Sequence, residues 1–113
     1  GVDLSANGIR GLIQSAALEG LPVQGVVADI TGFTPEGLFD VVLIDRTLHM
    51  LDEAPRLAVL SRLLDHVSDN GWLLIADERA NMAGFKSVLQ THSATWKVTL
   101  DKGGYYFLQR ETA

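Results

Sequence analysis

The sequence contains no cysteine, and this absence removes several classes of site at once. Without thiols there is no disulfide framework and no thiolate-bound metal, which fits a protein of the reducing cytoplasm. The three histidines, His49, His66 and His92, are scattered and make no metal-binding motif. We therefore expect no bound metal, and we expect His66 and His92 to face solvent.

Long apolar runs are also absent. The longest, such as residues 41–44, are far shorter than the roughly 20 residues that span a bilayer. The sequence opens with no basic and then apolar leader that ends in small residues. We expect a cytoplasmic protein without a membrane partner.

Positive charge is scarce as well. There are 9 Lys and Arg residues against 14 Asp and Glu residues, for a net charge of −5. Sequence-independent binding to phosphate backbones needs the opposite balance, so nucleic acid is not an expected partner. A small neutral or cationic ligand suits this field better.

What remains is the composition of an ordinary globular domain, with 47% apolar and 20% charged residues. At 113 residues the chain can bury one modest core, so we predict a single domain over residues 1–113. The chain begins at Gly1 without an initiator methionine, which fits a cut or engineered piece.

The first half of the chain predicts strand, helix, strand and loop. Residues 2–4 form a short strand, and Ser5 follows as an N-cap. Apolar residues then repeat at helical spacing until Gly20 and Pro22 end the helix. Residues 23–30 read as a second strand, and residues 31–37 as a loop.

The second half continues the alternation. A β-branched run at residues 39–45 is typical of a parallel strand that is covered on both faces. A loop at 46–51 precedes a helix whose apolar stripe is Leu57, Leu60, Leu64 and Val67. After a turn at 68–71, we predict a strand at 72–76, a helix around 82–89, and an antiparallel hairpin of 95–100 and 105–109.

Alternating strands and helices predict an α/β, Rossmann-like fold: a mostly parallel sheet with helices on both faces and a C-terminal antiparallel hairpin. In such sheets, ligands bind at the carboxyl ends of the strands. The polar residues at those ends are Asp3, Asp29, Asp45 and the loop from Arg46 to His49. These residues are the candidates for a functional site.

The order and spacing of five segments resemble a class I S-adenosylmethionine-dependent methyltransferase. The segments are Gly1-Val2-Asp3-Leu4-Ser5, Val27-Ala28-Asp29, Phe39-Asp40-Val41-Val42-Leu43, Leu48-His49-Met50-Leu51 and Asn70-Gly71-Trp72-Leu73-Leu74-Ile75-Ala76-Asp77. The likeness covers nearly the whole chain and includes the closing hairpin. The family's first strand and its glycine-rich turn would lie upstream of Gly1, so the resemblance implies a fold that is incomplete at the N-terminus.

The resemblance implies S-adenosylmethionine as cofactor and assigns its contacts. Asp3, with Leu4, would accept hydrogen bonds from the ribose hydroxyls, although Asp3 could instead help Ser5 to cap the helix. Asp29 and the backbone of Ile30 would hold the adenine amino group, although Asp29 could be a plain loop residue. Asp45 would lie beside the methionine part of the cofactor, or could pair with Arg46.

The loop after Asp45 would face the substrate. Arg46 and Thr47 are assigned to substrate binding, and Arg46 favours an acceptor with an anionic group. His49 could take a proton from the acceptor atom, which makes it the candidate catalytic residue; the alternative is that it only orients the loop. Asp77 and Glu78 follow the fourth strand on the ligand side, where they could serve substrate entry, but a solvated loop is the expectation.

The absent strand would lie at the centre of the sheet. Its loss would leave a gap of roughly 9.6 Å between two apolar strand edges, since neighbouring strands lie about 4.8 Å apart. Three solutions are open: the two edges pair directly, a second copy or another polypeptide supplies the strand, or the chain folds only marginally. We expect weak or no cofactor binding and no turnover by this chain alone.

Three functions stay open at this point. The first is the cofactor-binding and substrate-loop portion of a small-molecule methyltransferase. The second is a non-catalytic interaction or relic module with the same fold. The third is part of another doubly wound nucleotide-binding protein such as a nicotinamide dehydrogenase, which the closing hairpin argues against.

Overall fold

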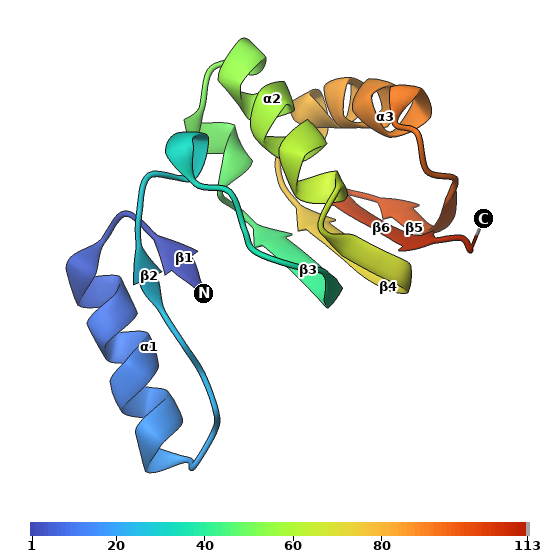
Figure 1. The fold of residues 1–113 in the computed structure, drawn as a ribbon. Helices are drawn as coiled ribbons and strands as arrows, with labels where there is room; N and C mark the ends of the chain where they lie inside the picture. Colours follow the sequence, from blue (N-terminus) through green and yellow to red (C-terminus); the bar gives the residue numbers. More distant parts are fainter. Residues whose placement is uncertain (113) are drawn as a thin grey trace. The chain divides into compact units, whose positions relative to one another are not determined.

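The computed structural model describes residues 1–112, which form two compact units, one from Gly1 to Thr34 and one that begins at Pro35 (Figure 1). Strands and helices alternate within each unit, so the predicted α/β class is confirmed. The expectation that residues 1–113 make a single domain stays a prediction. Among the described residues, no helix combines the length and apolar character that crossing a membrane requires.

The first unit pairs two short parallel strands beside one helix. Its elements are β1 (Val2–Asp3), α1 (Ala6–Leu18), β2 (Val26–Val27) and the 3-10 helix η1 (Ile30–Gly32). Val2 lies opposite Val26, and Asp3 lies opposite Val27. The parallel pairing places the carboxyl ends of both strands at the same edge.

Helix α1 begins and ends as the sequence predicts. The Ser5 hydroxyl accepts a hydrogen bond from the Gly8 N–H at 3.0 Å. At the other end, Gly20 has a φ of 68°, and its N–H and that of Leu21 donate to the carbonyls of Ala17 and Ala16. This is the Schellman pattern, in which a left-handed glycine ends the helix.

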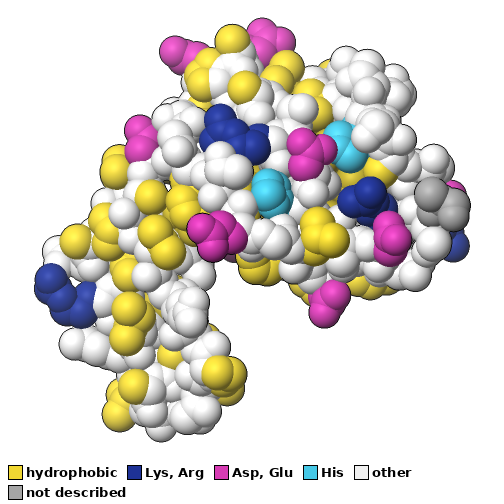
Figure 2. All heavy atoms as spheres, in the orientation of Figure 1, with side chains coloured by type: hydrophobic (Ala, Val, Ile, Leu, Met, Phe, Trp, Pro, Cys, Tyr) yellow, Lys and Arg dark blue, Asp and Glu magenta, His cyan; other side chains and the backbone are white. Residues whose placement is uncertain are grey.

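The apolar stripe of α1 is only partly buried. Ile9 and Ala16 are buried, whereas Leu12 and Ile13 are exposed by more than a third. Figure 2 shows apolar side chains at the surface of this unit. A unit of this size buries little apolar area, so its stability is expected to be small by itself.

The second strand is shorter than the predicted residues 23–30, and that prediction is wrong at both ends. Only Val26–Val27 pair with β1, because β1 itself offers two residues to the ladder. On the C-terminal side, the Asp29 carboxylate accepts from the Thr31 N–H at 3.0 Å and turns the chain into η1. This local bond competes with continued extension.

The second unit is a four-stranded sheet with two helices. Its elements are β3 (Phe39–Asp45), η2 (Leu48–Met50), α2 (Glu53–Leu64), β4 (Val67–Ala76), η3 (Arg79–Asn81), α3 (Met82–Thr91), β5 (Trp96–Lys102) and β6 (Tyr105–Arg110). The strand order is β3-β4-β6-β5, with β3 parallel to β4 and the other pairs antiparallel. The predicted hairpin is therefore confirmed, and its second strand joins it to the sheet.

Both helices of this unit pack on the same face of the sheet (Figure 1). The core consists of side chains that are fully buried: Val59, Leu60, Leu64, Leu73, Ile75, Phe85 and Leu108. The opposite face carries a row of apolar cross-strand partners: Leu43, Leu74, Phe107 and Leu100. The fully buried side chains between the sheet and the two helices supply the main stabilisation of the unit.

Two predictions at the junction of α2 and β4 are wrong. Val67, expected on the helix stripe, is fully buried as the first residue of β4. Residues 68–71, expected as a separate turn, lie within β4, where the partners change from Phe39 and Val67 to Val41 and Trp72. Asn70, with a φ of 60°, bends the strand there, so the turn residues make a bulge.

Strand β3 lies at an open edge of the sheet. Its single strand partner among the described residues is β4. On the face away from the helices, Val41 is 53% exposed and Leu43 is 65% exposed. A strand with these side chains and unpaired backbone groups favours the binding of a further strand.

We predict that Gly104→Ala destabilises the second unit by roughly 2 to 4 kcal/mol. Gly104 has a φ of 91°, and an added Cβ would lie 2.5 Å from the Asp77 carbonyl oxygen. Backbone cannot yield as a flexible side chain can. Urea unfolding monitored by circular dichroism measures the change.

The matched control is Gly37→Ala in the same unit. Gly37 also has a positive φ, 80°, but an added Cβ meets no atom within 4 Å. It should cost about 1 kcal/mol, which reflects the backbone conformation alone. Equal losses for the two variants would contradict the steric explanation.

Candidate functional site

The first unit brings two carboxylates to one sheet edge. Asp3 ends β1, and its carbonyl accepts from the Ala28 N–H at 2.9 Å. Asp29 follows one residue later, at the start of η1, and both aspartates are exposed. Leu4 and Ile30 are the next residues at each strand end. The unit thus holds together the four residues that were assigned to the ribose and adenine.

Asp3 combines a local role with a free acceptor. Its Oδ1 accepts from the Ser5 N–H at 2.9 Å, which helps to start α1. Among the described residues, nothing hydrogen bonds to its Oδ2. The helix-capping alternative is therefore present in the structure, and it leaves one oxygen of the carboxylate available for a ligand.

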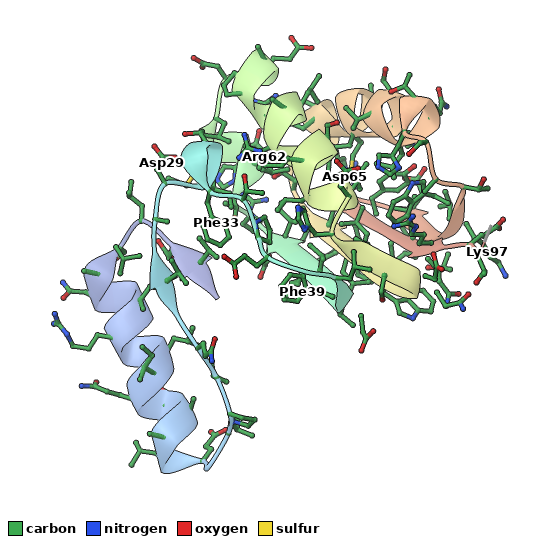
Figure 3. The ribbon with its side chains drawn as sticks, viewed as in Figure 1. Asp29, Phe33, Phe39, Arg62, Asp65 and Lys97 are labelled. Atoms are coloured by element: carbon green, nitrogen blue, oxygen red, sulfur yellow. The ribbon has the colours of Figure 1, made fainter. Side chains whose placement is uncertain are left out.

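Asp29 has the same division of its two oxygens. Its Oδ1 accepts from the Thr31 N–H at 3.0 Å and from the Thr31 hydroxyl at 2.7 Å. These bonds, the hydroxyl first, lower the pKa of Asp29 below its ordinary value of 3.8. Figure 3 shows Asp29 at the loop that follows β2. The carboxylate is held as an ionised acceptor at the surface.

In the second unit, the loop after β3 begins with a strained residue. Arg46 has a φ of 54°, and its N–H donates to the Ala76 carbonyl at 2.8 Å. The Thr47 hydroxyl donates to the Asp45 carbonyl at 3.1 Å. Non-glycine residues in this conformation are uncommon and concentrate at functional sites.

Asp45 and Arg46 do not pair with each other within the part of the chain that the structure describes. The alternative that Asp45 serves only an ion pair with its neighbour therefore has no support. The side chains of Asp45, Arg46 and Thr47 are all exposed at the carboxyl end of β3. Their roles toward cofactor and substrate stay predictions.

His49 is half-buried in η2 and is fixed through its backbone. Its N–H donates to Oδ2 of Asp77 at 3.1 Å. In its ring, Nδ1 is buried and finds no hydrogen-bond partner among the described residues, whereas Nε2 is not buried. Nε2 is therefore the ring nitrogen that can exchange a proton with a ligand.

Asp77 is the residue that sequence reasoning missed, because the expectation of a solvated loop is wrong for it. It is 4% exposed and is the one charged residue in the buried set of the described chain. The neighbouring Glu78 is exposed, as expected. The available signal for its burial was its position directly after the apolar run 72–76, where loop N–H groups can replace the water around a carboxylate.

The other two histidines are structural. The expectation that His92 faces solvent is wrong: its side chain is 8% exposed and its Nε2 lies 2.8 Å from Oδ1 of Asp65 at the end of α2 (Figure 3). Its Nδ1 accepts from the Ala94 and Trp96 N–H groups. His66 is half-buried, and its Nδ1 bonds the Gly37 carbonyl. The described residues include no cluster of three side chains suited to a metal ion.

We predict that Thr31→Val raises the pKa of Asp29 toward its ordinary value, because the hydroxyl bond is the largest cause of the lowered pKa. A carboxyl group with a lowered folded pKa stabilises the fold above pH 3.8 and loses that effect as pH falls through the folded pKa. In the variant, the folded pKa of Asp29 lies closer to 3.8, so the pH range over which this stabilisation is lost becomes narrower. Carbon-detected NMR titration of the Asp29 carboxyl measures it, with Thr34→Val as control.

No protein-family model and no curated protein matches the sequence. Among solved structures, N-methyltransferase NodS from Bradyrhizobium japonicum WM9 in complex with S-adenosyl-L-homocysteine is similar, with 15% identity over 98% of this chain and a TM-score of 0.71. An O-methyltransferase family protein from Burkholderia thailandensis has 16% identity over 99% of this chain and a TM-score of 0.72.

A ribosomal protein L11 methylase from Lactobacillus delbrueckii subsp. bulgaricus matches with 16% identity over 98% of this chain and a TM-score of 0.69. This chain spans 65%, 42% and 56% of the lengths of these three structures. The likeness is one of fold, because the identities are low. The chain has the fold of the class I S-adenosylmethionine-dependent methyltransferases over most of its length.

Proposed function

We propose that the protein containing this chain transfers a methyl group from S-adenosylmethionine to a small-molecule acceptor. The chain contributes the nucleoside-binding part and the substrate loop. The observation that carries the proposal is the pair of exposed carboxylates, Asp3 and Asp29, at neighbouring strand ends. Each has one oxygen engaged in the fold and one available for a ligand.

Asp3 accepts hydrogen bonds from the ribose hydroxyls, and Leu4 lies against the same part of the cofactor. A carboxylate suits a diol because its oxygens offer several lone pairs to two donors. Its exposure at the end of β1 supports this role. The bond to Ser5 fixes the carboxylate, so less side-chain freedom is lost on binding.

Asp29 accepts from the adenine amino group, and the backbone of Ile30 lies beside the ring. The Thr31 bonds hold the carboxylate and lower its pKa, which favours the ionised form. An ionised acceptor makes a stronger hydrogen bond than a neutral one. Because Asp29 follows the strand that pairs with β1, one unit contains both nucleoside contacts.

The loop after β3 serves the methyl-transfer end. When bound, S-adenosylmethionine supplies an electrophilic methyl group on a sulfonium. Asp45 faces the charged methionine part, and Arg46 and Thr47 contact the acceptor. His49 takes a proton from the acceptor through Nε2, the ring nitrogen that is not buried. Orientation of the reactants and exclusion of water lower the barrier of such a reaction.

A further strand completes the fold. Within the first unit β1 pairs with β2, and within the second unit β3 pairs with β4. The apolar edge of β3, with Val41 and Leu43 exposed, supports pairing with an added strand. We propose that a preceding segment or a second copy of the chain supplies it, and that the protein is cytoplasmic.

Two other functions remain as outcomes of experiment. A non-catalytic module with this fold would associate without any cofactor. A nicotinamide-binding protein would also use a carboxylate at the end of its second strand. The hairpin of β5 and β6 favours the methyltransferase over the dehydrogenase, because N-methyltransferase NodS and the O-methyltransferase family protein match over 98% and 99% of this chain, hairpin included.

We predict that Asp3→Asn weakens S-adenosylhomocysteine binding by about 10- to 100-fold in the longest natural form of the protein. Asparagine keeps an acceptor for the Ser5 N–H but replaces the second acceptor with a donor, so α1 should still begin at Ala6. Calorimetric titration measures the affinity. Glu19→Ala, another exposed acidic residue in this unit, is the control and should bind normally.

Unchanged affinity in Asp3→Asn would remove Asp3 from the site. Tighter binding of a nicotinamide dinucleotide than of S-adenosylhomocysteine would favour the dehydrogenase. Absence of binding in a folded, full-length protein would leave the interaction module as the better interpretation.

We also predict that residues 1–113 alone bind S-adenosylhomocysteine weakly or not at all and transfer no methyl group. The first unit, with two-residue strands, offers the nucleoside contacts without a glycine-rich turn for the methionine end. The measurement is calorimetry of this chain beside the longest natural form. Turnover by the isolated chain would overturn the prediction.

A further inference from the structure

A buried carboxylate ties two loops together at the carboxyl ends of β3 and β4. The side chain of Asp77 accepts three hydrogen bonds: from the His49 N–H at 3.1 Å, the Glu78 N–H at 2.7 Å and the Asn81 side-chain amide at 2.8 Å. Its backbone N–H donates to the Gly104 carbonyl at 2.9 Å. The residue is thus fixed by four partners, which come from η2, from its own loop and from the turn between β5 and β6.

Burying a carboxylate is costly unless donors replace its hydration. No cation contacts Asp77 directly within the described chain, and Asn81 connects it to one instead. The Asn81 amide donates to Asp77 and accepts from Nη1 of Arg56 at 2.8 Å. The neutral Asn81 amide therefore forms a relay: it is hydrogen bonded to both the guanidinium and the carboxylate, and the two charges polarise it in the same sense.

Arg56 also binds the loop that contains His49. From α2, its Nε donates to the Leu48 carbonyl at 3.2 Å and its Nη2 to the Leu51 carbonyl at 2.6 Å. The planar guanidinium can hold three acceptors in one fixed geometry. The loop that carries His49 is thereby held by its N–H on Asp77 and by two carbonyls on Arg56, with Leu48 fully buried beneath it.

We propose that Asp77 is a positioning residue for His49 in the proposed methyl-transfer site, acting with Asn81 and Arg56. By fixing the His49 backbone, it fixes the point from which the ring extends, and Nδ1 of that ring is buried. Pre-organisation of this kind lowers the ordering cost when a substrate binds. This inference rests on the proposed function for its catalytic meaning, but the ordering of the loop can be tested without it.

The test begins with amide hydrogen exchange of residues 1–113 by NMR. Asp77→Asn places an amide donor against the donors of Asn81 and Glu78, and the His49 N–H should exchange about tenfold faster or more. The Leu74 amide, in the centre of the sheet, should change by less than about threefold. An unchanged rate at His49 would overturn the proposal.

A double variant separates positioning from general loss of packing. In Asp77→Asn with Asn81→Asp, the amide of residue 77 donates to the new carboxylate, which also faces Arg56, and its oxygen still accepts from His49. The His49 exchange rate should return to within about threefold of the original. No recovery in the double variant would contradict the relay. If Asp77→Asn fails to fold, Asn81→Ala is the substitute variant. In it, the His49 N–H should exchange about threefold faster. An unchanged exchange rate would contradict the relay.

The functional readout uses the longest natural form with S-adenosylhomocysteine. Asp77→Asn should keep its affinity within about threefold, because the nucleoside contacts lie at Asp3 and Asp29. The NMR signal of His49 in the complex should broaden or shift relative to the original protein. A large loss of affinity with unchanged His49 exchange would place Asp77 in cofactor binding instead. If the original protein binds no S-adenosylhomocysteine, the proposed function fails, while the exchange experiment still decides the role of Asp77 in the loop.

Discussion

Parallel strand pairing is the constraint on which the candidate site depends. Two parallel strands end at one edge, so polar residues that follow them in the sequence become neighbours in space. In the first unit, Asp3 pairs with Val27, so Asp29, two residues further along, lies at the same carboxyl end of the sheet as Asp3. In the second unit, the pairing of Asp45 with Ala76 brings the loop after β3 beside Asp77. Asp3 and Asp29 are far apart in the sequence, and so are the loop after β3 and Asp77.

Burial gives chemically identical side chains different tasks in these two places. Asp3 and Asp29 are exposed, use one oxygen in a local turn, and retain the other for a ligand. Asp77 is 4% exposed and commits both oxygens to the protein. An exposed carboxylate can exchange water for a ligand at small cost, whereas a buried one fixes the groups around it.

The sequence predicts the elements whose signals are local. The Ser5 cap, the Gly20 end of α1, the apolar run of β3 and the closing hairpin each follow from a few neighbouring residues. The predictions fail where a distant partner decides. Val67 carries helical spacing but pairs with Phe39, and residues 23–30 could extend only as far as β1 offers a ladder.

The same distinction explains the site. The end of β3 at Asp45 and the loop after it could be predicted from the apolar run at residues 39–45, and the roles of Asp3, Asp29, Asp45 and His49 stay predictions. The burial of Asp77 and of His92 was not, because it depends on Gly104 and Asp65, each brought in by the folded chain. Which exposed residues touch a ligand is a property of the complete binding surface, which sequence spacing alone does not define.

The open edge of β3 makes the stability of this chain a property of its surroundings. Whatever strand binds Phe39–Asp45 binds the folded state and not the unfolded one, so its binding free energy adds to the free energy of unfolding. The midpoint of unfolding then rises with the concentration of that strand, or with its tethering in the same polypeptide, which acts as a high local concentration. Folding and assembly at this edge are one equilibrium.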